Sequence, residues 1–213
     1  MTALPVHDVA LFAGAALLLN LTPGPDMLFV AGTGAARGRQ AGLQAALGIG
    51  LGCLFHTVLA AVGLSALLAA SDLAFTAVKW AGAAYLVWTG ASMLRARRGS
   101  EAPAAASAAA GGNVFWQGAL TNALNPKVAL FFLAFLPQFI DAGAPGQAWA
   151  LVVLGTLFNI GGTGINLVVA LAASRVAQGM AARSRGGRIG SWFQRAAGAL
   201  FIGLGVKLAL SSR

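Results

Sequence analysis

Six long apolar segments follow one another along the chain, and short stretches between them hold most of its polar residues. Each segment is close to the ~20 residues that an α-helix needs to cross the hydrocarbon core of a bilayer. The segments cover residues 9–31, 42–70, 74–94, 114–136, 148–173 and 192–210. This pattern predicts an all-α polytopic membrane protein with six transmembrane helices.

The composition supports this prediction. Of the 213 residues, 58% are hydrophobic and 9% are charged, whereas roughly a quarter of the residues of a soluble domain are charged. The N-terminal sequence M-T-A-L-P-V-H-D-V-A contains no basic segment. We therefore expect the first span to be retained rather than cleaved as a signal peptide. The single cysteine, Cys53, excludes a disulfide framework and a paired-cysteine redox mechanism.

The net charge of +9 is distributed in short clusters between the apolar segments, which argues against nucleic acid as a partner. Basic residues follow the first, third and fifth segments, whereas the loops 71–73 and 137–147 contain no Lys or Arg. The positive-inside rule then predicts that both termini lie outside and that the arginine-bearing loops are cytoplasmic. These arginines are Arg37, Arg39, Arg95, Arg97, Arg98, Arg175, Arg183, Arg185, Arg188 and Arg195.

The two halves of the chain resemble each other. One fixed offset aligns L-T-P-G-P-D-M-L-F-V (21–30) with L-N-P-K-V-A-L-F-F-L (124–133), and G-C-L-F-H (52–56) with G-T-L-F-N (155–159). Each half has an odd number of spans, so the second half is inverted in the membrane relative to the first. The prediction is two inverted three-helix repeats, 1–98 and 113–213, joined by a flexible cytoplasmic linker at 99–112 that is rich in Ala, Gly and Ser.

Proline and glycine interrupt the first and fourth apolar segments, in T-P-G-P-D (22–26) and N-P-K (125–127). Proline removes a backbone donor and clashes with the preceding helical turn. Irregular backbone at this depth is tolerated only where it is buried or faces a water-filled cavity. We therefore expect helices 1 and 4 to be broken around one central cavity, as in many secondary transporters.

Asp26 and Lys127 are the charged residues that lie well inside these two segments. Intramembrane ionisable groups are candidates for function. Asp26 is expected to take a proton or the substrate ammonium, and Lys127 the substrate carboxylate or the resting charge balance. A structural ion pair and snorkelling toward the interfaces are the alternatives. Ideal helices would place the two residues about 15 Å apart along the membrane normal, which disfavours a tight pair.

Polar groups beside the breaks complete the candidate site. The amides beside the breaks can bind substrate, or they can form helix-to-helix hydrogen bonds. His56 can relay protons, or it can have a packing role. Gly48 and Gly52 can form a hinge, or they can allow close helix packing. The candidate substrate-binding residues are Thr22, Pro23, Gly24, Pro25, Asp26, Asn122, Asn125, Pro126 and Lys127; those for proton coupling are Asp26 and His56.

The sequence resembles the LysE/RhtB family of bacterial amino-acid exporters (LysE-type translocators). The resemblance lies in T-P-G-P-D (22–26), A-L-G-I-G-L-G-C-L-F-H (46–56), K-W-A-G-A-A-Y-L-V-W-T-G (79–90), G-A-L-T-N-A-L-N-P-K-V-A-L-F-F (118–132) and P-Q-F (137–139). It implies proton-driven efflux of amino acids or close derivatives across the bacterial inner membrane. We expect neutral amino acids or related small amino compounds as substrates, protons and membrane lipids as partners, and no cofactor. A homodimer stays open.

Two other functions fit the sequence less well. An ion or metal-ion exporter or channel on the same scaffold would recruit several carboxylate, histidine or thiolate ligands, and the spans contain few, so no metal site is predicted. An intramembrane enzyme would need a nucleophile with a base or a metal cluster. Asp26 and His56 are the only carboxylate and histidine within the predicted spans, and no G-x-S-x-G or H-E-x-x-H motif is present. We therefore do not expect an enzyme.

Overall fold

The structure of the protein is a computed structural model. It describes residues 4–64, 112–141 and 143–180, together with the isolated positions 76, 80, 84, 87, 91 and 206. The predicted spans 74–94 and 192–210 fall outside these residues apart from the isolated positions, and so does the linker 99–112 apart from Gly112. The described residues are helical, with a single antiparallel bridge between Val6 and Ile140.

The first predicted span is broken where its prolines lie. Helix α1 (Val9–Leu21) and helix α2 (Pro25–Arg37) meet at an angle of 46°. Pro25 occupies the first position of α2, where a backbone N–H has no intrahelical partner and its absence costs nothing. The predicted break in helix 1 is confirmed.

The fourth predicted span is broken in the same manner. Helix α6 (Val114–Ala123) and the segment that begins at Pro126 meet at 44°. That segment consists of α7 (Pro126–Leu130), the π-helical turn η3 (Phe131–Phe135) and the 3₁₀ turn η4 (Leu136–Phe139). The side chain of Asn125 caps the start of α7 by accepting a hydrogen bond from the Lys127 backbone N–H at 3.0 Å. This break is confirmed as well.

The described part of the second predicted span and the whole of the fifth are continuous helices. Helix α3 (Arg39–Leu59) continues into the π-helical turn η1 (Ala60–Leu64), and helix α8 runs from Gln147 to Met180. In the described ranges, two helices are long and apolar enough to cross a membrane, or up to four if each bent pair counts as one span. The structure is therefore that of a helical membrane protein, and the six-span count stays a prediction.

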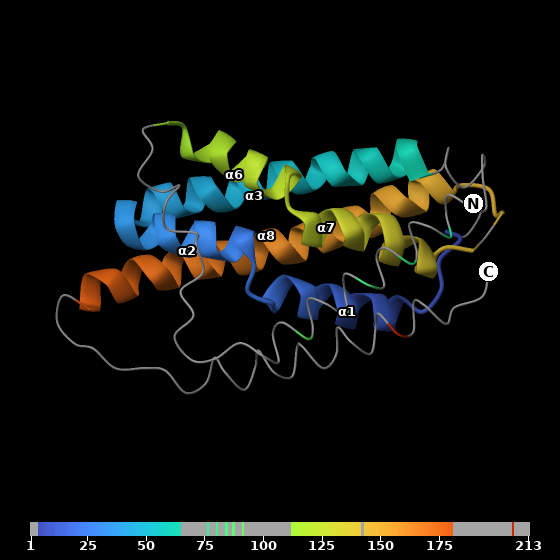
Figure 1. Cartoon of the computed structure of the whole chain (residues 1–213), viewed down its shortest axis with the longest axis horizontal. Helices are drawn as coiled ribbons and strands as arrows, with labels where there is room; N and C mark the ends of the chain where they lie inside the picture. Colours follow the sequence, from blue (N-terminus) through green and yellow to red (C-terminus); the bar gives the residue numbers. More distant parts are fainter. Residues whose placement is uncertain are drawn as a thin grey trace.

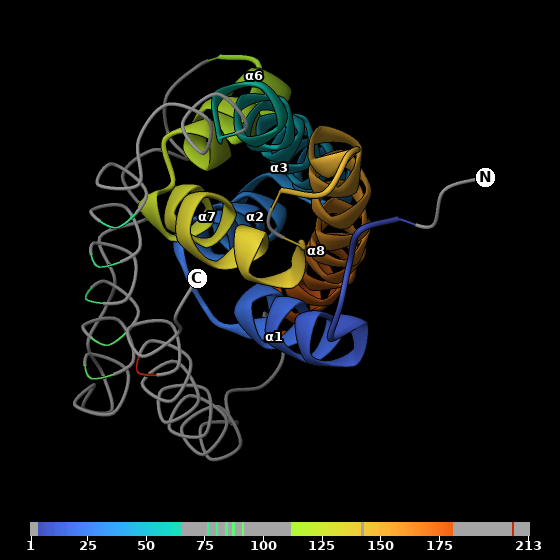
Figure 2. The same ribbon diagram turned by 90° about the vertical axis from the view of Figure 1, so that its right-hand side faces the viewer.

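The two bent pairs run in opposite directions (Figure 1). The pair α1–α2 runs from right to left in that view, whereas the pair α6–α7 runs from left to right, and α3 and α8 are likewise antiparallel. In the end-on view, α2 and α7 lie at the centre, with α1, α3 and α8 around them (Figure 2). The segments that follow the two breaks, α2 and α7, therefore lie in the middle of the described helices.

Helices α3 and α6 pack with their backbones close together at three glycines. A Cβ atom at Gly48 would overlap the carbonyl group of Phe115, and one at Gly52 would overlap the carbonyl oxygen of Ala119. From the other helix, a Cβ at Gly118 would overlap the Ala45 carbonyl oxygen. This contact fits the close-packing role for Gly48 and Gly52.

Phenylalanines fill the core between α1, η3, η4 and α8. Their rings contact one another in tilted, stacked and edge-to-face pairs, with Phe131 and Phe158 stacked at 4.6 Å between ring centroids. A smaller apolar cluster joins α2, α3, α6 and α8. The aromatic core contains Phe12, Phe131, Phe132, Phe135, Phe139 and Phe158.

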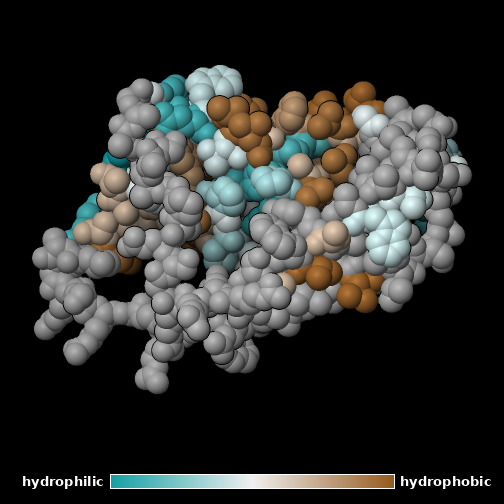
Figure 3. All heavy atoms as spheres, in the orientation of Figure 1, coloured by the Kyte–Doolittle hydropathy of each residue, from teal (hydrophilic) through white to brown (hydrophobic). Residues whose placement is uncertain are grey.

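Large apolar side chains also lie on the outside of the bundle, as the brown areas of Figure 3 show. Val58, Trp116 and Leu120 are each at least 60% exposed. A monomeric soluble protein exposes few such contiguous patches, whereas lipid solvates them. The exposed surface thus agrees with a chain that lies in a bilayer.

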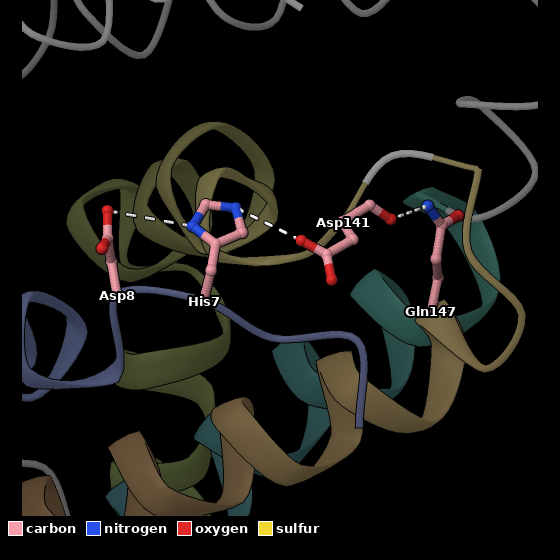
Figure 4. Close-up of polar contacts among 4 residues, drawn as sticks. All are labelled: His7, Asp8, Asp141 and Gln147. Atoms are coloured by element: carbon pink, nitrogen blue, oxygen red, sulfur yellow. Dashed lines mark hydrogen bonds and ion pairs between the residues drawn. The ribbon is translucent and has the colours of Figure 1, made fainter. Parts of the chain in front are cut away.

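Charged residues separate toward the two ends of the described bundle. Arg37 and Arg39 flank the junction of α2 and α3, at the end opposite to the start of α1 (Figure 1). At the other end, His7 lies between two carboxylates, 3.8 Å from Asp8 and 3.9 Å from Asp141 (Figure 4). The Asp141 carbonyl there accepts a hydrogen bond from the Gln147 side chain at 2.9 Å.

Candidate functional site

The two breaks are joined by a hydrogen bond between the two halves of the chain. Asn122, near the end of α6, donates from Nδ2 to Asp26 Oδ2 at the start of α2 over 2.8 Å. The carbonyl oxygen of Asn122 lies 2.9 Å from Nε2 of His56 on α3. The carboxylate, the amide and the imidazole therefore form one buried cluster. Sequence analysis selected all three side chains, and the structure brings them together.

Asp26 is buried at the N-terminal end of a helix and has spare hydrogen-bonding capacity. It lies in the first turn of α2, where the helix dipole favours a negative charge. Its side chain is 8% exposed, and Oδ1 has no hydrogen-bond partner. Buried polar atoms are nearly always paired, so an unpaired one indicates a function or a ligand. Asp26 can accept a proton or an N–H donor.

Lys127 is buried at the start of α7 and reaches across to α1. Its Nζ donates hydrogen bonds to the carbonyl oxygens of Leu19 at 3.1 Å and Thr22 at 3.0 Å. The ammonium group also touches Gly24, where a Cβ atom would lie 3.0 Å from Nζ. Only glycine leaves this space open without a contact that tight. Since Lys127 is 8% exposed, it does not snorkel to an interface.

Asp26 and Lys127 do not form a direct ion pair. Within the described ranges, the ion pairs are those of His7 with Asp8 and Asp141. Nevertheless, the long lysine side chain brings Nζ to Gly24, two residues from Asp26 in sequence. The ammonium is thus closer to the carboxylate than the ~15 Å between ideal helix positions suggested. Each charge is stabilised instead by the end of a broken helix.

A small cavity lies between these groups. Its free volume is ≈ 20 Å³, about the space that one water molecule requires. An amino acid does not fit into it in this conformation, so binding requires the helices to move. The lining residues are Asn20, Thr22, Asp26, Met27, Ile49, Cys53, Asn122, Lys127, Val128, Phe158, Asn159, Gly162, Thr163 and Asn166.

The remaining predicted residues lie beside the cavity rather than in its wall. Pro23, Pro25 and Pro126 are exposed and shape the breaks, while Asn125 is 1% exposed and caps α7. None of these, nor Gly24 or His56, lines the cavity. They determine the backbone conformation at the breaks and thereby the positions of Thr22, Asp26, Asn122 and Lys127.

Sequence analysis aligned Asn159 with His56 but missed the polar face of α8 to which Asn159 belongs. Asn159, Thr163 and Asn166 line the cavity and follow one another at intervals of four and three residues, as one helix face requires. Thr163 donates to Asn159 Oδ1 at 3.1 Å, and Asn159 donates to the Gly50 carbonyl at 3.1 Å. Asn20 joins this wall through a 3.2 Å hydrogen bond to the Phe158 carbonyl. The helical spacing of polar residues inside the apolar segment 148–173 was the signal that could have revealed this face.

Three hydrogen-bond acceptors of the cavity wall have no donor. Asp26 Oδ1, Asn122 Oδ1 and Asn166 Oδ1 are buried without hydrogen-bond partners, and all three residues line the cavity. A ligand with several N–H or O–H groups would pair with them. No group of three metal-binding side chains occurs in the part of the chain that the structure describes. The arrangement therefore suits a small molecule that carries an ammonium group.

Comparisons with known proteins identify the family of the chain. The family model of the LysE type translocator matches residues 17–212. An uncharacterized membrane protein of Pseudomonas aeruginosa is 34% identical over 100% of this chain and 99% of its own length. A homoserine/homoserine lactone efflux protein of Salmonella typhimurium is 33% identical over 90% of this chain and 91% of its own. A leucine efflux protein of Salmonella choleraesuis is 30% identical over 91% of each. No solved structure matches the chain significantly.

Proposed function

Because the chain belongs to the LysE type translocator family, we propose that it exports neutral amino acids, or related small amino compounds, from the bacterial cytoplasm by proton antiport. The family is one of translocators, not of enzymes. The observation that carries the proposal is the meeting of Asp26 and Lys127, from the two broken helices, at one buried cavity. A zwitterion offers a charge to each.

Homoserine and leucine are the first substrates to test, since relatives at 33% and 30% identity carry these names. The amino and carboxylate groups are common to both. The first turn of α2 has no side-chain cap, so its backbone N–H groups can face a carboxylate beside the Lys127 cation. Thr22, Asn122 and Asn125, with Pro23, Gly24, Pro25 and Pro126 shaping the backbone, form the rest of the substrate site.

Asp26 is the proposed proton carrier, with His56 connected to it. Asp26 has a free carboxylate oxygen, and its other oxygen is bonded to Asn122. Nε2 of His56 is hydrogen-bonded to the backbone carbonyl of the same asparagine. A proton on Asp26 would change the charge of the cavity as it opens alternately to the two sides, and that change couples proton entry to substrate exit.

The proposed architecture is two inverted repeats, 1–98 and 113–213, joined by the linker 99–112, in the inner membrane with both termini outside. The opposite directions of the pairs α1–α2 and α6–α7 support an inverted relationship (Figure 1). The arginines at the α2–α3 junction and the carboxylates at the opposite end support the orientation. Alternating access then moves one repeat against the other around the central site.

Transport by the purified protein in liposomes tests the function. Liposomes loaded with unlabelled homoserine or leucine should accumulate the same labelled amino acid by counterflow, and liposomes without protein should not. An imposed pH gradient should drive net movement of that substrate against its own gradient. If no amino acid of a panel that includes these two is exchanged, the proposed function is wrong.

A further inference from the structure

The ammonium group of Lys127 occupies a site made entirely of main-chain carbonyl oxygens. Nζ lies 3.1 Å from the Leu19 oxygen and 3.0 Å from the Thr22 oxygen, at the C-terminal end of α1. The last carbonyls of a helix have no intrahelical donor and carry partial negative charge. They attract a cation, and here the cation comes from the other half of the chain.

The proline in the first break creates this site. In a continuous helix, the Leu19 carbonyl would accept a hydrogen bond from the N–H of residue 23, but Pro23 has none. The Leu19 carbonyl accepts instead from the Thr22 N–H at 3.2 Å, and its second lone pair remains for the ammonium. Thr22 follows α1 in an extended conformation, so its carbonyl points out of the helix ladder. Gly24 leaves room for Nζ, since a Cβ atom there would lie 3.0 Å from it. The Leu19 and Thr22 carbonyls, with Gly24 beside them, thus form a cradle for one ammonium group.

The ammonium binds these neutral carbonyls, although a carboxylate is nearby. Asp26 makes no ion pair with Lys127 within 4.0 Å; among the described residues His7 alone forms such pairs. Thr22 and Lys127 both line the central cavity, so the cradle lies at the edge of the space that a substrate would enter. The amino group of an amino acid is the same chemical group as the end of a lysine side chain.

We propose that the Leu19 and Thr22 carbonyls bind the substrate's primary ammonium group, and that Lys127 fills this site in the empty protein as a tethered substitute. The proposal rests on the proposed function, since the substrate must be an amino acid. When substrate enters, its ammonium replaces that of Lys127, and the displaced lysine is free to face the substrate carboxylate. Asp26 then remains available for the proton. The Leu19 and Thr22 carbonyls thus accept hydrogen bonds from Lys127 in the empty protein and from the substrate ammonium in the substrate-bound protein.

Chemical rescue tests the cradle without requiring transport. Lys127→Ala removes the atoms that n-propylammonium can restore. The unfolding temperature of the purified variant should be below that of the wild type and should rise saturably with n-propylammonium, by about 2–4 °C for each kcal/mol of binding. Tetramethylammonium, which has the charge but no N–H group, should have no such effect. Lys127→Met fills the space without a donor and should not respond, and neither should the wild type.

The double variant Asp26→Asn/Lys127→Ala tests whether propylammonium binds the Leu19 and Thr22 carbonyls or the Asp26 carboxylate. The unfolding temperature of the double variant should still rise with propylammonium. Because this variant buries no uncompensated charge, it can also replace Lys127→Ala in the experiment if that single variant does not fold. Loss of the response in this variant, or an equal response to tetramethylammonium, would overturn the proposal.

The link to substrate is tested by adding an amino acid that the wild type exchanges. The amino acid and propylammonium should each raise the unfolding temperature of Lys127→Ala, but the two increases should not add, because both ligands need the same carbonyls. Additive increases would overturn the proposal. Absence of amino-acid counterflow in the wild type, with the amine response intact, would instead reject the proposed function and leave the carbonyl site as an amine site.

Discussion

Asp26 combines features that a coupling residue needs. It is buried, one carboxylate oxygen has no hydrogen-bond partner, and it has no cation within ion-pair distance among the described residues. A buried carboxylate in this situation is costly while it is charged. Asn122 and the end of α2 offset part of this cost. The part of this cost that is not offset favours protonation of Asp26 when the cavity is closed to water, and release of the proton when the cavity opens.

Asp26→Asn keeps the shape of the side chain and removes its change of charge. We expect it to abolish uphill efflux driven by a pH gradient in proteoliposomes, while counterflow of the same substrate survives at least in part. Both rates are measured with one labelled amino acid in parallel preparations. A variant that still concentrates substrate would show that Asp26 is not the coupling group, and His56 would be the next residue to test.

Thr163 provides a test of the polar face of α8. Thr163→Val removes the hydroxyl that donates to Asn159 Oδ1 and leaves that cavity-lining amide without its donor. We expect the apparent affinity in counterflow to fall about 3- to 10-fold. Thr121→Val is the matched control, because its hydroxyl donates to the Gln117 carbonyl within α6, away from the cavity. Equal effects of both substitutions would remove Thr163 from the substrate site.

The elements themselves were largely predictable because their causes are local. Pro23, Gly24 and Pro25 restrict their own backbone, so the first break could be located from sequence, and Asn125 with Pro126 located the second. The π-helical turn η3 (Phe131–Phe135) was not predicted. It lies among packed phenylalanine rings, and no residue within it breaks a helix by itself.

Partners between elements could not be predicted in the same way. Lys127 was correctly identified as an intramembrane charge, but its acceptors are main-chain carbonyls more than 100 residues earlier in the chain. A carbonyl group is present at every position, so a sequence contains no signal for which one is used. The three-dimensional path of α1 decides it. The same limitation hid the pairing of Asn159 with the Gly50 carbonyl.

Gly48 tests the contact between α3 and α6. In Gly48→Ala the new methyl group would overlap the Phe115 carbonyl, and backbone cannot move aside as a flexible side chain can. Overpacking of this kind costs about 1–3 kcal/mol, which corresponds to an unfolding temperature lower by roughly 5 °C.

Gly32→Ala in α2 is the matched control for that substitution, since a Cβ there meets nothing within 4 Å. Removing a helix-interior glycine should leave stability unchanged or raise it slightly. Thermal unfolding of both variants in detergent decides the outcome. A Gly48→Ala variant as stable as Gly32→Ala would show that α3 and α6 are not packed as closely as described here.

At the scale of the whole molecule, the two bent pairs of helices run in opposite directions (Figure 1). Each half contributes a bent pair and a long helix, α1–α2 with α3 and α6–α7 with α8 (Figure 1). This arrangement brings an acid from the break in one half and a base from the break in the other half to a single cavity. It also leads us to expect that the complete repeats superpose about an axis in the membrane plane. A structure whose halves are related by an axis along the membrane normal would contradict that expectation.

The orientation of the molecule can be measured by cysteine labelling. Cys53 is the only native cysteine, and Cys53→Ser gives a background without thiols. Gln40 lies beside the arginines of the α2–α3 junction, and Pro145 lies in the loop before α8; both are exposed. With the basic ends in the cytoplasm, Pro145→Cys should react with a membrane-impermeant maleimide on intact cells, whereas Gln40→Cys should react only after the membrane is opened. A cysteine at position 185, which lies outside the described residues, should behave as Gln40→Cys does. If Gln40→Cys or the cysteine at position 185 reacts from outside, the predicted orientation is wrong.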